Sequence, residues 1–491
     1  MKQFIKNIIW GMTCLVMGIL TACSNGNEEI DSLSVRTELS RTAELEANIA
    51  LEEVGTLDAA LVAAVGEENK YKVTKLTLSG EVNVDDIETL HKLAYLEYLD
   101  VSEITWSYTE GNNEYSFQAN LWGDRFDNCI GNLWDDMGIS NYMFAGFIYL
   151  KEIKLPNTAT SIGYFSLGGC MALETVEIPS SVNSIYNEGL ARTGIKELTI
   201  PASVINVDAE FCRYCIKLRA IYWESEAKVP SCYEQENVLI YVPNADVIVA
   251  PSWKNVILDG VAESIELSAK YPWEDDQYAF ICTKSFTAKK ISYKRWFDLW
   301  TSIGSNGGWE TIVLPFAPDS IYHESKGEIA PFNSGKTGAK SFWLRSLTST
   351  GFTDVTAIEA DIPYIIAMPN NDRYHEETRL NGWVTFVGLN VTIEASSEQP
   401  SAVDGPDFSL QPTYEPIEMS NSIYSLNVRD GFGYDQGSIF IRGGGDVRAF
   451  EAYAVVGGRS VKSLIDMDCS SDNTRSVTIP NNTGIPQIGD M

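Results

Sequence analysis

The sequence predicts a strand-rich chain with little helix, in which a solenoid of short stacked coils precedes an all-β, sandwich-like domain. Two observations support this prediction. An apolar phrase returns at a nearly constant step between residues 51 and 262, and from residue 263 onward separate strand-like segments bounded by turn residues replace it. A chain of 491 residues, 44% of them hydrophobic, is long enough for two or three folded domains.

The repeated phrase has the form Leu-x-x-h-x-h, in which h is an apolar residue. Its six copies begin at Val73, Leu96, Leu150, Leu173, Ile195 and Leu218. The last four follow one another at steps of 23, 22 and 23 residues. One such coil cannot bury its own apolar positions, so coils stack and share a core. A period of about 20–29 residues with this phrase is the leucine-rich repeat signature.

Neighbouring side chains of a strand point to opposite faces. The first h positions should therefore point into the core: Leu76, Leu99, Ile153, Val176, Leu198 and Ile221. The positions beside them should form an exposed ladder, whose candidate ligand-binding residues are Tyr98, Asp100, Glu152, Lys154, Thr175, Glu177, Glu197 and Tyr222. The same ladder includes Lys75, Thr77, Thr199 and Ala220. These residue types are equally typical of a solvated surface, so the ladder by itself does not specify a ligand.

A proline ends several of the repeat strands, and Thr158, Ser181 and Ser203 follow it where leucine-rich repeats usually carry Asn. This pattern, I-P-S-S-V-x-x-I in its fullest copy, resembles the BspA-like leucine-rich repeat family over roughly residues 51–262. The resemblance implies a secreted or surface protein, chiefly of Gram-negative anaerobes. It also implies a non-catalytic role in adhesion to host or bacterial surface proteins.

The first residues have the pattern of a lipoprotein signal peptide. Residues 1–22 carry Lys2 and Lys6 before an apolar run, and Leu20-Thr-Ala-Cys23 matches the bacterial lipobox. Cys23 is thus the predicted lipidation site, and residues 23–50 form an acidic tether with the pair Glu28-Glu29. We expect an outer-membrane protein, anchored by lipid and exposed at the surface. The net charge of −31 argues against nucleic acid as a partner.

An aromatic insert at residues 102–137 interrupts the repeat frame. Trp106 and Trp122 within it are candidate ligand-binding residues, because sugars and peptides stack on aromatic rings. The favoured interpretation is that the insert's rings fill the core of a lengthened coil. The alternative function, a glycan-binding surface lipoprotein of a polysaccharide-uptake system, depends on this insert.

Two further regions complete the predicted organisation. The spacing of Leu57, Leu61 and Val65 predicts a helix that caps the first coil. The all-β domain spans residues 263–460, and a polar tail follows at 461–491. The candidate strands of the all-β domain cover residues 309–316, 342–347, 362–368, 383–393, 423–428, 438–442 and 450–456.

The motifs that suggest catalysis lack the context that their chemistry needs. Residues 330–337 fit a loose phosphate-binding loop, but no strand and helix are expected around Lys336. Cys212-x-x-Cys215 could suggest redox or metal chemistry, yet Cys215 occupies the repeat position of Cys170, where a small core side chain fits. Beyond Cys23, seven scattered cysteines remain, without the spacing of a disulfide framework. We therefore predict no enzyme activity, cofactor or metal.

Overall fold

The structure is a computed structural model that describes residues 44–108, 111, 113–119, 121, 127–233, 236–269, 279–301, 307–395, 400–418, 423–428, 435–442, 446–455, 465–466 and 477–478. The signal segment, Cys23 and Trp122 lie outside the described residues. The chain forms two compact units. The first contains the residues up to 182 and 186–193, and the second contains 183–185 and the residues from 194 onward. No helix within the described ranges is long and apolar enough to span a membrane.

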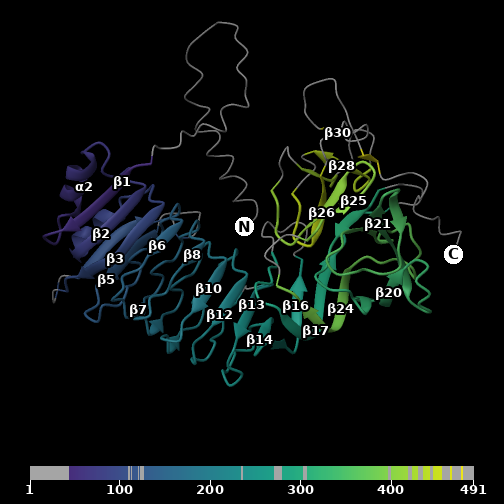
Figure 1. Cartoon of the computed structure of the whole chain (residues 1–491), viewed down its shortest axis with the longest axis horizontal. Helices are drawn as coiled ribbons and strands as arrows, with labels where there is room; N and C mark the ends of the chain where they lie inside the picture. The colour runs from purple at the N-terminus through teal and green to yellow at the C-terminus, as the bar shows by residue number, and fades with distance from the viewer. Residues whose placement is uncertain are drawn as a thin grey trace, which may run out of the picture. The chain divides into compact units, whose positions relative to one another are not determined.

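The first unit is built on parallel strands in the order β1-β2-β3-β6-β8 (Figure 1). Their bounds are β1 Glu46–Leu51, β2 Lys75–Val82, β3 Tyr98–Trp106, β6 Glu152–Lys154 and β8 Thr175–Val176. Leu76 lies opposite Leu99, Leu99 opposite Ile153, and Ile153 opposite Val176. The repeat step of the sequence therefore sets the register of the sheet, as predicted.

Two helices lie beside the first strands: α2 at Leu57–Val65, where the spacing predicts a helix, and α3 at Val84–Leu90. The helix α3 starts at a capping box, in which Asn83 and Asp86 each accept a hydrogen bond from the other's backbone N–H. The buried Asp86 carboxylate also accepts the N–H groups of Gly55 and Leu57. One carboxylate thus fixes the start of both helices.

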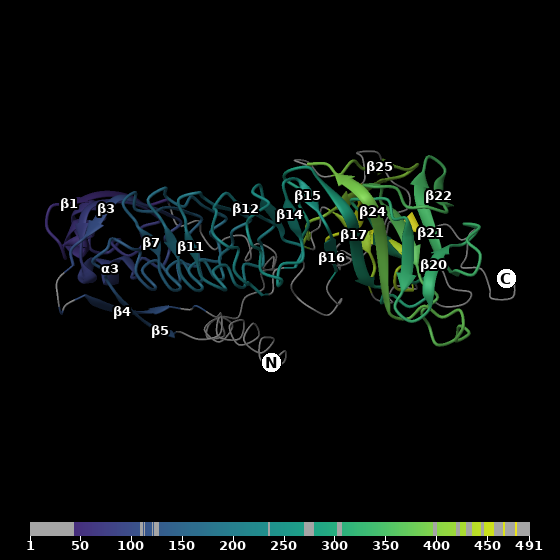
Figure 2. The ribbon, with the colours of Figure 1, turned by 90° about the horizontal axis from the view of Figure 1, so that it is seen from below.

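The aromatic insert forms a hairpin of β4 (Glu114–Ala119) and β5 (Asp127–Asn132). Figure 2 shows this hairpin beside α3, and the Ser116 N–H donates to the Glu88 carboxylate of that helix. The imidazole of His91 stacks between Phe117 and Phe147, with ring centroids 3.4 and 4.9 Å away. The hairpin therefore packs onto the unit through aromatic contacts.

The second unit contains the remaining repeat strands and the C-terminal sheets. The repeat strands are β10 Glu197–Ile200, β12 Ala220–Trp223, β13 Leu239–Val242 and β14 Val256–Leu258. The short strands β9 (Ser184–Ile185) and β11 (Asn206–Val207) pair with each other, and β7 (Ser161–Ile162) belongs to the first unit. The main sheet continues with β15 Val261–Ala262, β16 Ile265–Ser268, β17 Phe286–Trp296, β18 Glu310–Ile312, β19 Ser320–His323, β20 Gly327–Pro331, β21 Lys340–Thr348, β22 Gly351–Asp354, β23 Tyr364–Ala367 and β24 Trp383–Ile393. A second sheet contains β25 Val403–Asp404, β26 Ser409–Thr413, β27 Tyr424–Leu426, β28 Ile439–Arg442, β29 Glu451–Val455, β30 Ile465–Asp466 and β31 Val477–Thr478.

Each of the seven C-terminal segments predicted as strands overlaps one of these strands, β21 extends beyond its predicted segment at both ends, and β24 has the predicted bounds. The chain is thus strand-rich and helix-poor. Neither large sheet closes on itself, and a sandwich arrangement stays a prediction. The main sheet runs from β14 through β15 to β17 without a break. The boundary between the compact units lies at residues 183–194, and not at residue 262. The predicted domain boundary at that residue is not tested by this division.

A buried ionic cluster joins the two sheets of the second unit. Arg295 of β17 donates to Glu310 of β18 and to Glu451 of β29, at 2.7 Å each. Arg448 also contacts Glu451 at 2.8 Å. Burial raises the pKa of Glu310 even though Arg295 lies beside it. The positive charges of two guanidinium groups thus balance the negative charges of two carboxylates inside the protein.

Candidate functional site

The outward-facing side chains of the repeat strands in the first unit form the candidate surface, which we call the ladder face. Its partly exposed members are Lys75, Thr77, Tyr98 and Asp100, and its exposed members are Glu152, Lys154, Thr175 and Glu177. On β3 and β6, Tyr98 lies opposite Glu152 and Asp100 lies opposite Lys154. The intervening Leu99 and Ile153 are 0% and 3% exposed, so the predicted alternation holds for these strands.

Asp100 and Lys154 form the charged centre of the ladder face. The Lys154 Nζ lies 3.0 Å from the Asp100 Oδ2 and 5.6 Å from the centre of the Tyr98 ring. Partial burial acts to raise the pKa of Asp100, but hydrogen bonds from the Ser102 Oγ–H and N–H and the contact with Lys154 lower it overall. The hydrogen bonds with Tyr98 and Asp100 raise the pKa of Lys154. This pair is therefore charged and mutually neutralised at neutral pH.

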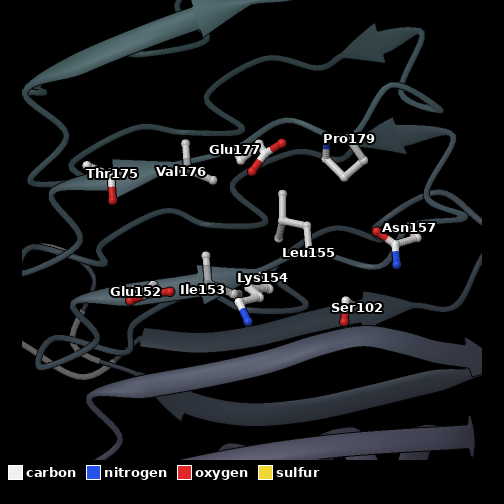
Figure 3. A pocket seen from close by; sticks show the side chains of 10 residues that line it. All are labelled: Ser102, Glu152, Ile153, Lys154, Leu155, Asn157, Thr175, Val176, Glu177 and Pro179. Carbon is white, nitrogen blue, oxygen red and sulfur yellow. The ribbon is translucent and has the colours of Figure 1, made fainter.

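A hollow of about 430 Å³ opens on the ladder face at the ends of β6 and β8. Only two residue pairs join these strands, Glu152 with Thr175 and Ile153 with Val176, so the chains after them are not bridged by sheet hydrogen bonds. The residues that line it are Ser102, Glu152, Ile153, Lys154, Leu155, Asn157, Thr175, Val176, Glu177 and Pro179. Figure 3 shows Leu155 between the side chains of Lys154 and Glu177, with Glu152 and Thr175 at one end and Ser102 and Asn157 toward the other.

The hollow combines an apolar interior with an acidic rim. Ile153, Leu155, Val176 and Pro179 supply apolar surface. Glu152 and Glu177 are exposed, and neither forms an ion pair with any other residue in the described ranges. A site of this kind can accept an apolar side chain next to a positive charge.

The prediction that Val176 is buried is wrong. Its side chain is partly exposed and lines the hollow, because β8 ends at this residue and no sheet hydrogen bonds join the segments that follow β6 and β8. The other inward positions, Leu76, Leu99, Ile153, Leu198 and Ile221, are at most 3% exposed. Of the hollow's lining, the sequence did not predict Ser102, Ile153, Leu155, Asn157, Val176 and Pro179 as site residues. The prolines at 156 and 179, which follow β6 and β8, were the available signal, since no sheet hydrogen bonds join the segments beyond these strands.

The ladder changes character in the second unit. Glu197 and Thr199 of β10 are exposed as predicted, but Ala220 of β12 is fully buried, which corrects its assignment as an exposed position. Tyr222 is only partly exposed, because its hydroxyl donates to Glu197 at 2.8 Å and also bonds the Thr283 hydroxyl. Residues 279–286 cover this part of the ladder, and Phe280, Cys282 and Phe286 join Ala220 in one core cluster.

The aromatic insert supplies core residues. Trp106 is 4% exposed and its indole N–H donates to the Trp134 carbonyl at 2.9 Å, so its ring is not presented as a stacking platform. Tyr115 is fully buried and donates its hydroxyl to the Asn141 carbonyl. These positions agree with the favoured interpretation of the insert and correct the assignment of Trp106 as a ligand-binding residue. Trp122 lies outside the described residues.

Lys336 has neither a helix after it nor a phosphate-binding geometry around it. It lies between β20 and β21, where its Nζ contacts the Glu328 carboxylate at 2.7 Å. Cys170 and Cys215 are 0% and 2% exposed, as expected for equivalent core positions in two repeats.

Comparison with known proteins identifies the repeats. Residues 137–234 match the family described as "BspA type Leucine rich repeat region (6 copies)". This part of the chain is a BspA-type leucine-rich repeat region. It has the proline-ended strands and the register described above, and the resemblance predicted over residues 51–262 is thereby confirmed in its central part.

Two solved structures match this chain at low overall similarity. A leucine-rich repeat protein from Eubacterium ventriosum shares 16% identity, with 43% of this chain and 57% of that chain covered and a TM-score of 0.22. Another from Bacteroides ovatus shares 16% identity, with 46% and 77% covered and a TM-score of 0.20. The chain thus spans little more than half of the first of these proteins. No curated protein matches.

Proposed function

We propose that this protein is a non-catalytic, lipid-anchored interaction protein that binds other proteins through the ladder face of its first unit. The observation that carries the proposal is the hollow at β6 and β8, which places apolar surface beside two unpaired carboxylates on an otherwise solvated face. Adhesion to host or bacterial surface proteins is the biological role that such binding would serve. The repeat architecture supports this role, because stacked coils present an extended binding surface.

The partner's chemistry follows from the charges around the hollow. Lys154 is neutralised by Asp100, so Glu152 and Glu177 leave the hollow with a negative rim. A loop that presents a Lys or Arg next to an aliphatic side chain would fill the apolar interior and pair with the rim. The net charge of −31 would speed the approach of such a basic partner at low ionic strength.

A binding screen with charge-reversal variants tests the proposal. A soluble form of the mature chain, residues 24–491 without the lipidation site Cys23, is screened against extracellular-matrix proteins, mucin and a panel of polysaccharides. For a protein that binds, the double change Glu152→Lys with Glu177→Lys should weaken binding at least tenfold. Glu224→Lys with Glu226→Lys is the matched control, because it makes the same charge change at exposed positions of the second unit. Equal losses in the two variants would show that only net charge matters, and would contradict a site at the hollow.

The lipid anchor is part of the proposal and has its own test. The lipobox at Leu20–Cys23 supports acylation of Cys23. Cys23→Ala should leave the precursor uncleaved and unlabelled by a fatty-acid probe, whereas continued labelling would contradict the assignment. Surface exposure is tested by adding protease to intact cells, which should remove the protein. Full protection would place it on the inner leaflet.

Glycan binding is the second candidate, and a different part of the first unit supports it. Tyr95 and Tyr149 are 49% and 51% exposed, and their rings lie 6.5 Å apart at an angle of 19°. Exposed aromatic faces in near-parallel orientation can stack on sugar rings. Polysaccharide binding in the same screen, lost in Tyr95→Ala with Tyr149→Ala but retained in the charge-reversal variant, would favour this function over protein binding.

A further inference from the structure

Two cysteines of neighbouring coils in the second unit face each other. Cys212 precedes β12, and Cys232 lies in the next coil, 20 residues later. Their sulfur atoms are 3.7 Å apart, and the two residues are 1% and 2% exposed. The Cys212-x-x-Cys215 spacing draws attention to the pair within one coil, but the structure also brings the Cys212 thiol into contact with that of Cys232 in the next coil. We propose that Cys212 and Cys232 form a disulfide that joins these two coils.

The backbone around the pair is aligned for such a bond. The Glu210 N–H donates to the Ser231 carbonyl at 2.9 Å, and the Tyr233 N–H donates to the Glu210 carboxylate at 3.3 Å. One backbone hydrogen bond thus joins the two coils within two residues of each cysteine. Both cysteines lie outside the strands, and the observation that supports the bond is the 3.7 Å between their sulfur atoms. To form an S–S bond of about 2 Å, the two side chains must move toward each other.

Burial decides when the bond forms. A thiolate is the reactive form of cysteine, and burial raises the pKa of the Cys212 thiol well above its usual value. The native pair therefore reacts slowly, and oxidation takes place while the coils are still assembling. The oxidant is a second disulfide, such as oxidised glutathione or a dithiol–disulfide oxidase. The Cys212 thiolate attacks it to give a mixed disulfide and one thiol. The Cys232 thiolate then attacks the Cys212 sulfur and releases the second thiol, so two protein thiols become one disulfide while the oxidant is reduced to two thiols.

Peptide mapping of the refolded protein tests the pairing. The mature chain is unfolded in urea with a phosphine reductant, freed of the reductant, refolded with reduced and oxidised glutathione, and then treated with N-ethylmaleimide in urea so that buried thiols also react. The proposal predicts a cross-linked peptide pair containing Cys212 and Cys232, with Cys170 and Cys215 alkylated. Alkylation of both Cys212 and Cys232, or a bond between Cys212 and Cys215, would overturn it.

A melting experiment supplies a second readout. The oxidised protein should resist the phosphine reductant until denaturant is added, because both sulfurs are buried. Once the bond has been reduced, Tm should fall by about 5–10 °C, since the bond constrains a loop of this length in the unfolded chain. Cys232→Ser should show no such reductant-dependent shift, whereas Cys170→Ser, which removes a buried thiol of another coil, should retain it. Equal Tm values for the oxidised and reduced wild-type protein would contradict a stabilising bond.

Discussion

The same repeat phrase gives an open surface in the first unit and a covered one on β12 and β13 of the second. On β3 and β6, the ladder positions are Tyr98, Asp100, Glu152 and Lys154, and their charged groups meet solvent. On β12 and β13, the corresponding side of the sheet carries Tyr222 and Tyr241, whose rings stack at 5.5 Å. Residues 279–286 cover them, and the Tyr241 hydroxyl donates to the Lys284 carbonyl at 3.0 Å.

This difference shows that the repeat determines which residues point inward. The residue type at each ladder position depends instead on whether solvent or another segment of the chain contacts it. Leu99 and Ile221 are both fully buried, although they belong to different units. Most ladder residues are charged or polar where the face is open, whereas Tyr222 and Tyr241 occupy the ladder where a later segment of the chain covers it. We infer that the ladder contributes binding in the first unit and stability in the second.

The largest expected effect concerns the covered ladder. Tyr241→Ala removes a ring that is 7% exposed and packs against Tyr222 and Phe286. It should lower the free energy of unfolding by about 3–5 kcal/mol, because a large buried aromatic side chain leaves a cavity. Tyr98→Ala on the open ladder is the matched control and should cost about 1 kcal/mol or less. Urea unfolding measures both, and equal costs would remove the distinction between the two regions.

The first unit has its own stability element at His91. Burial lowers the pKa of His91 to about 3, although its hydrogen bond to the Met143 carbonyl favours the charged form. The residue is partly exposed, but Phe117 and Phe147 stack on its ring. In the unfolded chain the imidazole takes up a proton below about pH 6.5, and in the folded protein it stays neutral down to about pH 3.

The stabilisation by neutral His91 is therefore present above about pH 6.5 and is lost as the pH falls toward 3. Between pH 7 and pH 5, the free energy of unfolding should fall by about 2 kcal/mol through this residue. His91→Gln should remove that part of the pH dependence in urea unfolding. His375→Gln, at an exposed position, should retain it. Identical pH profiles for the wild type and His91→Gln would show that the ring titrates normally.

Much of the fold of the first unit could be predicted from the sequence, whereas the segment that covers the ladder in the second unit could not. The repeated phrase predicts the register of Leu76, Leu99 and Ile153, and helix spacing predicts α2. Periodicity cannot predict that residues 279–286 lie on β12 and β13, because that contact joins distant parts of the chain. The long strand β17 was missed for a related reason. Its alternation is interrupted at Lys289 and Lys290, and its partner β24 lies about 100 residues later.

The hollow is the part of the site that sequence reasoning did not find. A repeat frame treats every strand as equally long, but β8 has two residues and β10 has four. Where the strand ends early, Val176 becomes partly exposed and Leu155 and Pro179 line an opening. The length of each strand depends on packing between coils, which the repeated phrase does not encode.

The smallest stability effect is expected at the hollow. Val176→Asp should cost about 1 kcal/mol, because a partly exposed side chain loses little burial and the new carboxylate stays hydrated. Glu177→Ala should stay within about 0.5 kcal/mol. Ile153→Asp, one strand away and 3% exposed, should cost several kcal/mol by burying a charge. Comparable losses for Val176→Asp and Ile153→Asp in urea unfolding would mean that Val176 belongs to the core.

A paired measurement at Tyr98 and Tyr222 tests the central claim, that the open ladder binds and the covered ladder stabilises. Each tyrosine is changed to Ala in the mature chain, and Kd for the tightest-binding matrix protein or mucin is measured together with Tm. We expect Tyr98→Ala to weaken binding at least tenfold with little change in Tm, and Tyr222→Ala to lower Tm without changing Kd. Unchanged binding in Tyr98→Ala together with weakened binding in Tyr222→Ala would contradict the account.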